Sequence, residues 1–412
     1  GKYGERFDTL VPPIINDNNI FVAHRTKIES YSLPDGKSKW KLDLNGSRVW
    51  SGISFDSTTN TILAVTSNLV NLIGKTDIKN DFSNSFLLID GKNGDVRCKF
   101  KDTLHDHWDL DMTGNPIVTN VKLKNGKTAT VAYAFSKTGN TFVVNIKECK
   151  LINSSSIKVI NTKSMSPIIN QTYSSYQNKI TNPTKLMSLN YDLEEYLTNI
   201  KNDKINYDYV KFRSRSALYN DEYIPLSLNY DVIMTGIHGG PEWPGGTLDK
   251  LNNQIIITTN HHPWIIRSYY LAKEKEFIDE IKYFLSRLEA HEGKTVYENK
   301  CASCHQSNKH GVYESEMFGD NYIPSLIGVS YLNKFKSLDS LEKFNFSHSY
   351  TKLKNNLTNK DLNILKDYFK KNDEFLKDNN LLEIKASWQL FLDKHKNFAS
   401  IPPFGKIRSI NL

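Results

Sequence analysis

The pentapeptide Cys301-Ala302-Ser303-Cys304-His305 constrains this chain of 412 residues more than any other feature. Cys-x-x-Cys-His is the attachment signature of a c-type haem, in which two thiols bind the porphyrin and the histidine binds the iron. A zinc site would need a second ligand pair at similar spacing, and the other two cysteines stand singly. The motif therefore predicts haem attached at Cys301 and Cys304, with His305 as an iron ligand.

The second axial ligand of this haem should come from residues after the motif. Many c-type cytochromes use a methionine shortly before the last helix, but the only methionine after His305 is Met317, which follows it closely. His348 lies shortly before the capping-box pattern Thr358-x-x-Asp361, where that methionine would fall. We expect His305/His348 ligation, which lowers the reduction potential relative to a His/Met pair. Iron that is open or bound by Met317 is the alternative.

The amino-terminal part of the chain reads as short strands separated by turns. Apolar runs rich in β-branched residues occur at 20–23, 61–65, 86–89 and 142–144, with Gly- and Asn-containing turns between them. Strands at this density, with no long helices between them, predict an antiparallel all-β fold.

An internal repeat narrows the prediction. The pattern Trp-x-Gly-x-x-x-Asp, followed by Thr-x-Asn, occurs at residues 50–68 and again at 243–260. A second similarity links residues 28–33 to 407–412. Repeated four-strand units with a Trp-Gly-Asp signature are typical of a β-propeller.

The spacing of apolar residues changes near residue 271 from that of strands to that of a helix. We place the expected domain boundaries from this change. We expect partial propeller blades over 1–270, in which the polar stretch 150–225 is a long excursion between blades. An amphipathic linking helix is predicted for 271–293, a cytochrome c module for 294–372 and a return into the propeller for 385–412. The cytochrome module would thus be inserted between blades.

Charge and hydropathy limit the partners and the compartment. The net charge is +8, but the lysines are scattered without an Arg-rich stripe, which argues against nucleic acid. No apolar run approaches the roughly 18 residues of a membrane span. Haem c is attached outside the bacterial cytoplasm, so we expect a periplasmic protein whose signal peptide is not in this chain. In that compartment Cys98 and Cys149 could form a disulfide.

The stretch His105-Asp106-His107-Trp108-Asp109-Leu110-Asp111 gathers three carboxylates and two histidines around one tryptophan. This density suits metal binding or general-base catalysis. A solvated turn with Trp108 wedged into the fold is the alternative, and the residues alone do not choose between them.

With this stretch, five segments resemble the pyrroloquinoline-quinone-dependent dehydrogenases, the quinoprotein alcohol and membrane-type glucose dehydrogenases. In the family's order they are residues 48–68, 105–111, 136–140, 239–246 and 402–407. The resemblance implies a mainly β protein, part of an eight-bladed β-propeller, with an inserted all-α cytochrome c domain. Because the chain holds roughly half of such a propeller, we expect a partial chain.

The resemblance also implies roles for individual cofactor-binding residues. Trp50 matches the tryptophan that stacks under the quinone ring, and Trp243 matches a second tryptophan beside it. Lys137 matches the basic residue that hydrogen-bonds the quinone carbonyls. Glu242 stands where many members have asparagine. The repeat makes blade-sealing an additional role for Trp50 and Trp243.

The implied metal is calcium or a lanthanide. Asn68 and Asp109 match metal ligands, and Asp109 also matches the catalytic aspartate that accepts the substrate proton. Asp111 matches an extra acid of lanthanide-using members, although membrane-type glucose dehydrogenases have aspartate there too. Asn260 occupies the repeat position of Asn68, and we favour Asn68 because it precedes the acidic stretch.

These implications predict a quinohaemoprotein that oxidises an alcohol, polyol or sugar with pyrroloquinoline quinone. Electrons would pass to the haem and then to a downstream cytochrome, quinone or oxidase. The alternative is a c-type electron carrier whose propeller is only a docking scaffold, and a third hypothesis is an adhesion or assembly module. The acidic stretch together with Lys137 favours the enzyme, since a scaffold needs neither.

The haem ligation has a direct spectroscopic test. If His348 binds the iron, the near-infrared magnetic circular dichroism spectrum of the ferric protein should lack a methionine-sulfur charge-transfer band. Such a band would exclude His348 and assign Met317.

Overall fold

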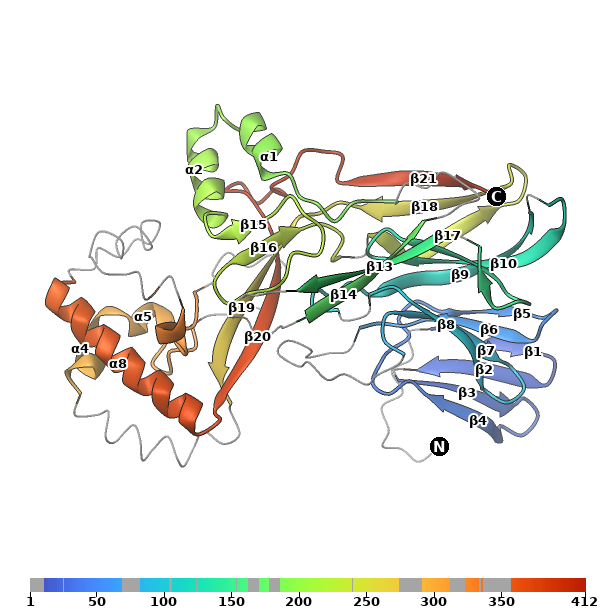
Figure 1. The fold of residues 1–412 in the computed structure, drawn as a ribbon, viewed down its shortest axis with the longest axis horizontal. Coiled ribbons are helices and arrows are strands. Elements are labelled where there is room, and N and C mark those ends of the chain that lie inside the picture. Colours follow the sequence, from blue (N-terminus) through green and yellow to red (C-terminus); the bar gives the residue numbers. More distant parts are fainter. Residues whose placement is uncertain are drawn as a thin grey trace.

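The computed structural model shows several antiparallel sheets at one end and a helical module at the other (Figure 1). The structure describes residues 11–24, 26–68, 82–103, 106–123, 125–152, 154–161, 170–177, 186–238, 240–273, 291–311, 323–332, 335 and 357–412. No helix in these ranges is both long and apolar enough to cross a membrane. The prediction of a mainly β fold with a separate helical part is confirmed.

Three four-stranded sheets are built from strands that are consecutive in the sequence. The first contains β1 (Ile14–Asn16), β2 (Asn19–His24), β3 (Lys27–Ser32) and β4 (Ser38–Asp43). The second contains β5 (Ile53–Asp56), β6 (Thr61–Val65), β7 (Ser85–Asp90) and β8 (Val96–Lys101). The third contains β9 (Met112–Lys122), β10 (Thr128–Ser136), β11 (Thr141–Asn145) and β12 (Lys150–Leu151). This meander within each sheet is the strand order of propeller blades.

Strand β6 explains why these sheets stack. Successive side chains of a strand point to opposite faces. Ile62 and Ala64 accordingly pack into the core against the first sheet, whereas Leu63 and Val65 pack into the core against the third. Because both faces are buried, the strand reads as a continuous apolar run rather than an alternating one.

The sequence repeat corresponds to a structural repeat. Its first copy forms the hairpin β5–β6, and its second forms the hairpin of β17 (Pro241–Asp249) and β18 (Gln254–Asn260). Asp56 and Asp249 end the first strand of each hairpin, and each accepts hydrogen bonds from backbone N–H groups of the turn. The second similarity relates β3, which pairs with β2 in the first sheet, to β21 (Gly405–Asn411), which pairs with β18.

The stretch 150–225, expected as an irregular excursion, contains regular elements. It holds the hairpin of β13 (Ser154–Asn161) and β14 (Asn170–Gln177) and the short helices α1 (Leu193–Asn199) and α2 (Lys204–Arg213). Asp192 and Asp203 cap these helices, because each carboxylate accepts a backbone N–H of the first turn.

The helical module contains α4 (Glu292–Lys300), α5 (Ala302–His305), the short 3-10 helix η1 (Val329–Tyr331) and α8 (Asn359–Asp378). Helix α8 begins at the predicted capping box of Thr358 and Asp361, and it buries the predicted apolar face Leu362, Leu365, Tyr368 and Phe369. It ends at Asp378, six residues beyond the expected limit of the module at residue 372.

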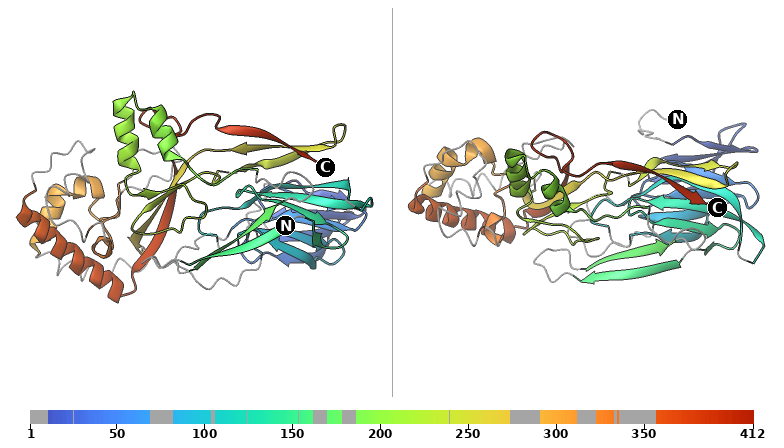
Figure 2. Two further views of the ribbon diagram at one scale, coloured as in Figure 1. Left: turned by 45° about the horizontal axis from the view of Figure 1, so that its top comes forward. Right: turned by 90° about the horizontal axis from the view of Figure 1, so that it is seen from above.

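The sheet that receives this module combines distant strands. It contains β15 (Ala217–Leu218), β16 (Asp231–Met234), β19 (Trp264–Ala272) and β20 (Leu382–Leu390), and β17, β18 and β21 form a separate three-stranded sheet. The module lies between β19 and β20, which pair over nine residues (Figures 1 and 2). The expected insertion between blades is therefore wrong: the module interrupts one sheet.

The predicted linking helix over 271–293 falls mostly outside the described residues. Residues 271 and 272 end strand β19, and Glu292 and Gly293 begin α4. Both ends of that stretch thus belong to other elements, and residues 274–290 are not described.

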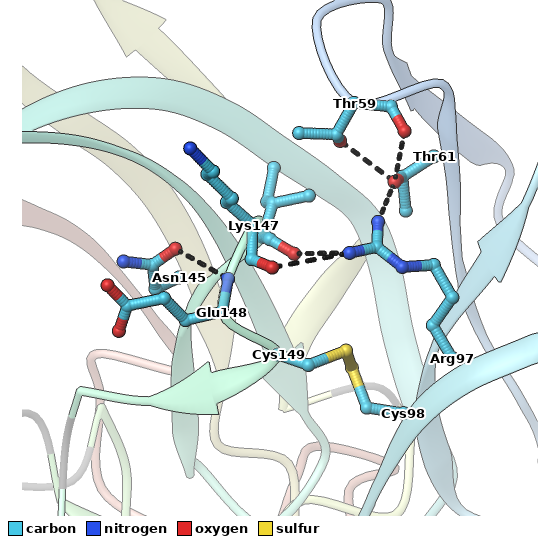
Figure 3. Close-up of a disulfide and its surroundings, with 9 residues drawn as sticks. Thr59, Thr61, Arg97, Cys98, Asn145, Lys147, Glu148 and Cys149 are labelled. Carbon is cyan, nitrogen blue, oxygen red and sulfur yellow. Dashed lines mark hydrogen bonds between the residues drawn. A yellow bond between two sulfur atoms is a disulfide. The ribbon is translucent and has the colours of Figure 1, made fainter.

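A disulfide between Cys98 and Cys149 joins the second and third sheets (Figure 3). Cys98 lies in β8, and Cys149 directly precedes β12. The neighbouring Arg97 crosses the same junction, where its guanidinium donates to the Thr61 hydroxyl and to the carbonyls of Ile146 and Lys147.

Removal of this disulfide should destabilise the sheet junction. The double substitution Cys98→Ser and Cys149→Ser should lower the free energy of unfolding by about 2–4 kcal/mol, because the crosslink restrains the unfolded chain. Urea denaturation followed by tryptophan fluorescence measures this effect. Each single substitution also removes the crosslink, so both should lower the midpoint about as much as the double substitution, and an unchanged midpoint in the double variant would contradict the expectation.

Candidate functional site

The Asp106 carboxylate shapes the acidic loop that links β8 to β9. It is buried and accepts hydrogen bonds from the backbone N–H groups of Trp108, Asp109 and Leu110 at 2.8, 3.1 and 2.7 Å. The side-chain amide of Asn84 donates to the same carboxylate at 2.9 Å. One aspartate therefore satisfies three successive backbone donors, as short polar side chains do in Asx turns.

The carbonyls of this loop are held equally well. Trp388 Nε1 donates to the Trp108 carbonyl at 3.0 Å, and Lys137 Nζ donates to the Asp109 carbonyl at 3.0 Å. Asn84 Nδ2 donates to the Leu110 carbonyl at 3.0 Å. These bonds hold Asp109 at φ +72°, a left-handed conformation that residues other than glycine seldom adopt.

Four of the predicted site residues meet on this loop. Lys137 Nζ lies 3.3 Å from Asp109 Oδ2 and 3.2 Å from Asp111 Oδ2. Asn68 donates its side-chain amide to Asp109 Oδ1 at 3.1 Å and its backbone N–H to Asp111 Oδ1 at 2.6 Å. Lys137 and Asp111 are buried, whereas the Asp109 side chain is 39% exposed. Asp109 is therefore the carboxylate that a substrate could reach.

The buried Asp102 carboxylate fixes the turn that carries Lys137. It accepts hydrogen bonds from Thr138 Oγ1 at 3.0 Å, from Asn140 Nδ2 at 2.6 Å and from the Ser136 hydroxyl. The backbone N–H of Lys137 donates to the Asp111 carbonyl at 3.1 Å, so this turn and the acidic loop are joined directly.

The cluster holds more negative than positive charge. Burial would lower the pKa of Lys137, but Asp111 and Asp109 outweigh that effect and raise it. Although the Asp109 side chain is 39% exposed, the protein groups packed around its carboxylate, together with the charge of Asp111, raise its pKa to about 7 by desolvation and repulsion, against the opposing effect of Lys137. Burial also raises the pKa of Asp106 to about 6. One ammonium does not balance three nearby carboxylates.

Two glycines place both Trp-x-Gly segments beside this loop. Asn115 of β9 lies between Gly52 and Gly245, and a Cβ atom on either glycine would come within 3 Å of Asn115 atoms. Trp50 carries the Arg48 guanidinium 5.6 Å from its ring centre. Trp243 lies in β17, and its side chain and that of Glu242 fall outside the described part of the structure. Stacking of Trp50 and Trp243 on a quinone stays a prediction.

The donor set of the loop fits a hard cation. Asp109 and Asp111 offer carboxylate oxygens and Asn68 carries an amide oxygen, and calcium prefers such ligands. In this structure Asn68 directs its amide N–H to Asp109 Oδ1, so its side chain would have to turn to present its oxygen to a bound cation. Calcium takes six to eight oxygens. Within the described ranges no group of three His, Cys, Asp or Glu residues gathers as a metal site.

The Cys-x-x-Cys-His motif lies on a short helix. Cys301 caps helix α5, and His305 ends it, with both residues buried. His305 Nδ1 lies 2.9 Å from the Pro324 carbonyl. Because a carbonyl only accepts, Nδ1 carries the proton there and leaves Nε2 as the ligand atom. His348 and Met317 lie outside the described residues, so the second axial ligand stays a prediction.

Sequence reasoning missed several residues that hold this site. No local motif marks these residues. Folding brings Asn84 and Trp388 to the acidic loop, and it brings Asp102 to the turn that carries Lys137. Asp106 lay within the acidic stretch, but its neighbours gave no sign that it binds backbone rather than ligand. The available signal was its position, because Asp106 lies two to four residues before the backbone N–H groups that donate to it.

Comparisons with known proteins show which proteins this chain is similar to. Quinoprotein glucose dehydrogenase A of Acinetobacter calcoaceticus is 27% identical over 138 residues, which cover 29% of this chain and 17% of the relative. Quinoprotein glucose dehydrogenase of Escherichia coli (strain K12) is 22% identical over 177 residues, 35% of this chain and 22% of the relative. These matches thus span about a fifth of the curated relatives' length.

Among solved structures, the quinohemoprotein alcohol dehydrogenase from Comamonas testosteroni aligns with a TM-score of 0.43 and 14% identity. That alignment covers 63% of this chain and 38% of that chain. The cytochrome c family model matches residues 290–372, which include Cys301 and His305.

A second family model matches residues 22–310, more than half of the chain. It describes the β-propeller domain of the PQQ-dependent glucose, ethanol and alcohol dehydrogenases. This chain belongs to that family.

Proposed function

We propose that this chain is part of a periplasmic quinohaemoprotein dehydrogenase that oxidises the CH–OH group of a small alcohol, polyol or sugar. The observation that carries the proposal is the meeting of Asn68, Asp109, Asp111 and Lys137 in a chain that also bears a haem-attachment motif. A docking scaffold for an electron carrier would not need an accessible aspartate beside a buried lysine.

Asp109 is the proposed catalytic base. Its carboxylate is the exposed member of the cluster, and it would accept the proton of the substrate hydroxyl. Bound pyrroloquinoline quinone would supply the hydride acceptor. Lys137 directs its ammonium to the same place and would stabilise negative charge that develops on a carbonyl oxygen.

Asn68, Asp109 and Asp111 are the proposed ligands of calcium or a lanthanide. The cation would act as a Lewis acid beside Asp109 and would offset the surplus carboxylate charge. Trp50 and Trp243 would complete the cofactor site from the two repeat segments that flank Asn115.

Cys301, Cys304 and His305 would hold the haem that receives the electrons, with His348 as the proposed second ligand. The electrons would then leave to a cytochrome, a quinone or an oxidase. The periplasm is the proposed compartment, because haem c is attached outside the bacterial cytoplasm and the disulfide of Cys98 and Cys149 suits an oxidising environment.

The first prediction from this proposal concerns electron flow. In the full-length protein, with haem attached and with quinone and calcium or a lanthanide added, an alcohol or sugar should reduce the haem. The ferrous haem absorption bands report this reduction. If dithionite reduces the haem but none of a panel of alcohols and sugars does, the chain is an electron carrier and not a dehydrogenase.

The second prediction concerns Asp109. The substitution Asp109→Asn should lower kcat by about 10²–10⁴-fold, because the amide cannot accept the substrate proton. Reduction of the haem by dithionite should not change. Asp249→Asn, in the hairpin turn of the second repeat, is the matched control and should leave kcat unchanged. A kcat near the wild-type value in Asp109→Asn would assign the proton to another group.

A further inference from the structure

We propose that Trp388 is a positioning residue that sets the backbone of Asp109 from the strand returning from the haem module. The inference rests on the proposed function, because it assigns Trp388 a part in the work of Asp109. Trp388 lies in β20, 280 residues from the loop in sequence, and its Nε1 donates to the Trp108 carbonyl at 3.0 Å.

This bond acts on one peptide plane. The Trp108 carbonyl and the Asp109 N–H belong to the same planar peptide unit. Trp388 holds the carbonyl, and the Asp106 carboxylate holds the N–H at 3.1 Å. The orientation of this plane sets φ of Asp109, so the two bonds together hold the left-handed value of +72°.

One hydrogen bond from Trp388 is strong enough to affect the backbone conformation of Asp109. A left-handed conformation is unfavourable for a residue with a Cβ atom, and its cost is comparable with the stabilisation from one hydrogen bond. Trp108 itself is anchored on the far side, where its Nε1 donates to the Ile224 carbonyl at 2.7 Å. Loss of the Trp388 bond would therefore free the peptide plane next to Asp109 rather than move the whole loop.

The opposite end of the paired strands β19 and β20 carries the helical module (Figure 2). Strands β19 and β20 pair from Trp264 and Leu390 to Ala272 and Leu382. At the module end, the Tyr270 ring meets the edge of Tyr331 with centres 6.3 Å apart. A buried cluster there consists of Ala272, Ile327, Leu376 and Leu381. The paired strands β19 and β20 thus contact the haem module at one end and, through Trp388, the Asp109 loop at the other.

Trp264 provides a matched control for Trp388. It lies on the partner strand β19, is buried and belongs to the hydrophobic cluster that contains Trp108. Among the described residues, the indole N–H of Trp264 has no hydrogen-bond partner. Trp264→Phe therefore removes the same side-chain atoms as Trp388→Phe, from the strand paired with β20, but it removes no hydrogen bond.

Hydrogen exchange of the loop amides tests the positioning role without any turnover. In the haem-loaded full chain, Trp388→Phe should speed exchange in peptides covering residues 106–112 by roughly fivefold to tenfold, the loss of about one hydrogen bond. Trp264→Phe should leave that exchange unchanged. Trp388→His, which retains a ring N–H, should restore part of the protection.

Kinetics of the quinone-loaded protein complete the test. Trp388→Phe should lower kcat by a similar factor and leave KM unchanged, while Trp264→Phe should leave both unchanged. Unchanged exchange in Trp388→Phe, equal acceleration in both Phe variants, or faster exchange with an unchanged kcat would each overturn the proposal. If substrate fails to reduce the wild-type haem, the dehydrogenase function fails, and the exchange result then decides the loop contact alone.

Discussion

The buried ammonium of Lys137, held between Asp109 and Asp111, is the interaction on which the site depends. A charge taken out of water is costly unless it is paired, so Lys137 requires both carboxylates. Burial, and to a smaller extent the charge of Asp111, raises the pKa values of Asp106 and Asp109 to about 6 and about 7. Within this cluster, the surplus carboxylate therefore lies next to solvent at Asp109.

Two further buried acids keep these charges in place without taking part in the ion pairs. Asp106 binds the backbone of the acidic loop, and Asp102 binds the turn that carries Lys137. Hydrogen bonds to backbone and amide groups satisfy both carboxylates, as burial requires. Asp106 and Asp102 therefore set the geometry of the site, whereas Lys137, Asp109 and Asp111 provide its charged groups.

Local sequence patterns predicted the local structure well. The capping box of Thr358 and the apolar face of α8 both formed where the spacing placed them. The insertion point was misread because strands β19 and β20 pair residues more than a hundred positions apart, and no local period encodes that pairing. The contact of Trp388 with Trp108 was missed for the same reason.

The placement of the helical module between two hydrogen-bonded strands also dictates an order of folding. Strand β20 can pair with β19 only when Ala272 and Leu382 are brought together, and the folded module does this, with the Lys273 N–H bonded to the Leu381 carbonyl. Without it, the sheet must close a long open loop, which is entropically unfavourable and slow. If haem is attached at Cys301 and Cys304 as proposed, its attachment would stabilise the module that closes this sheet.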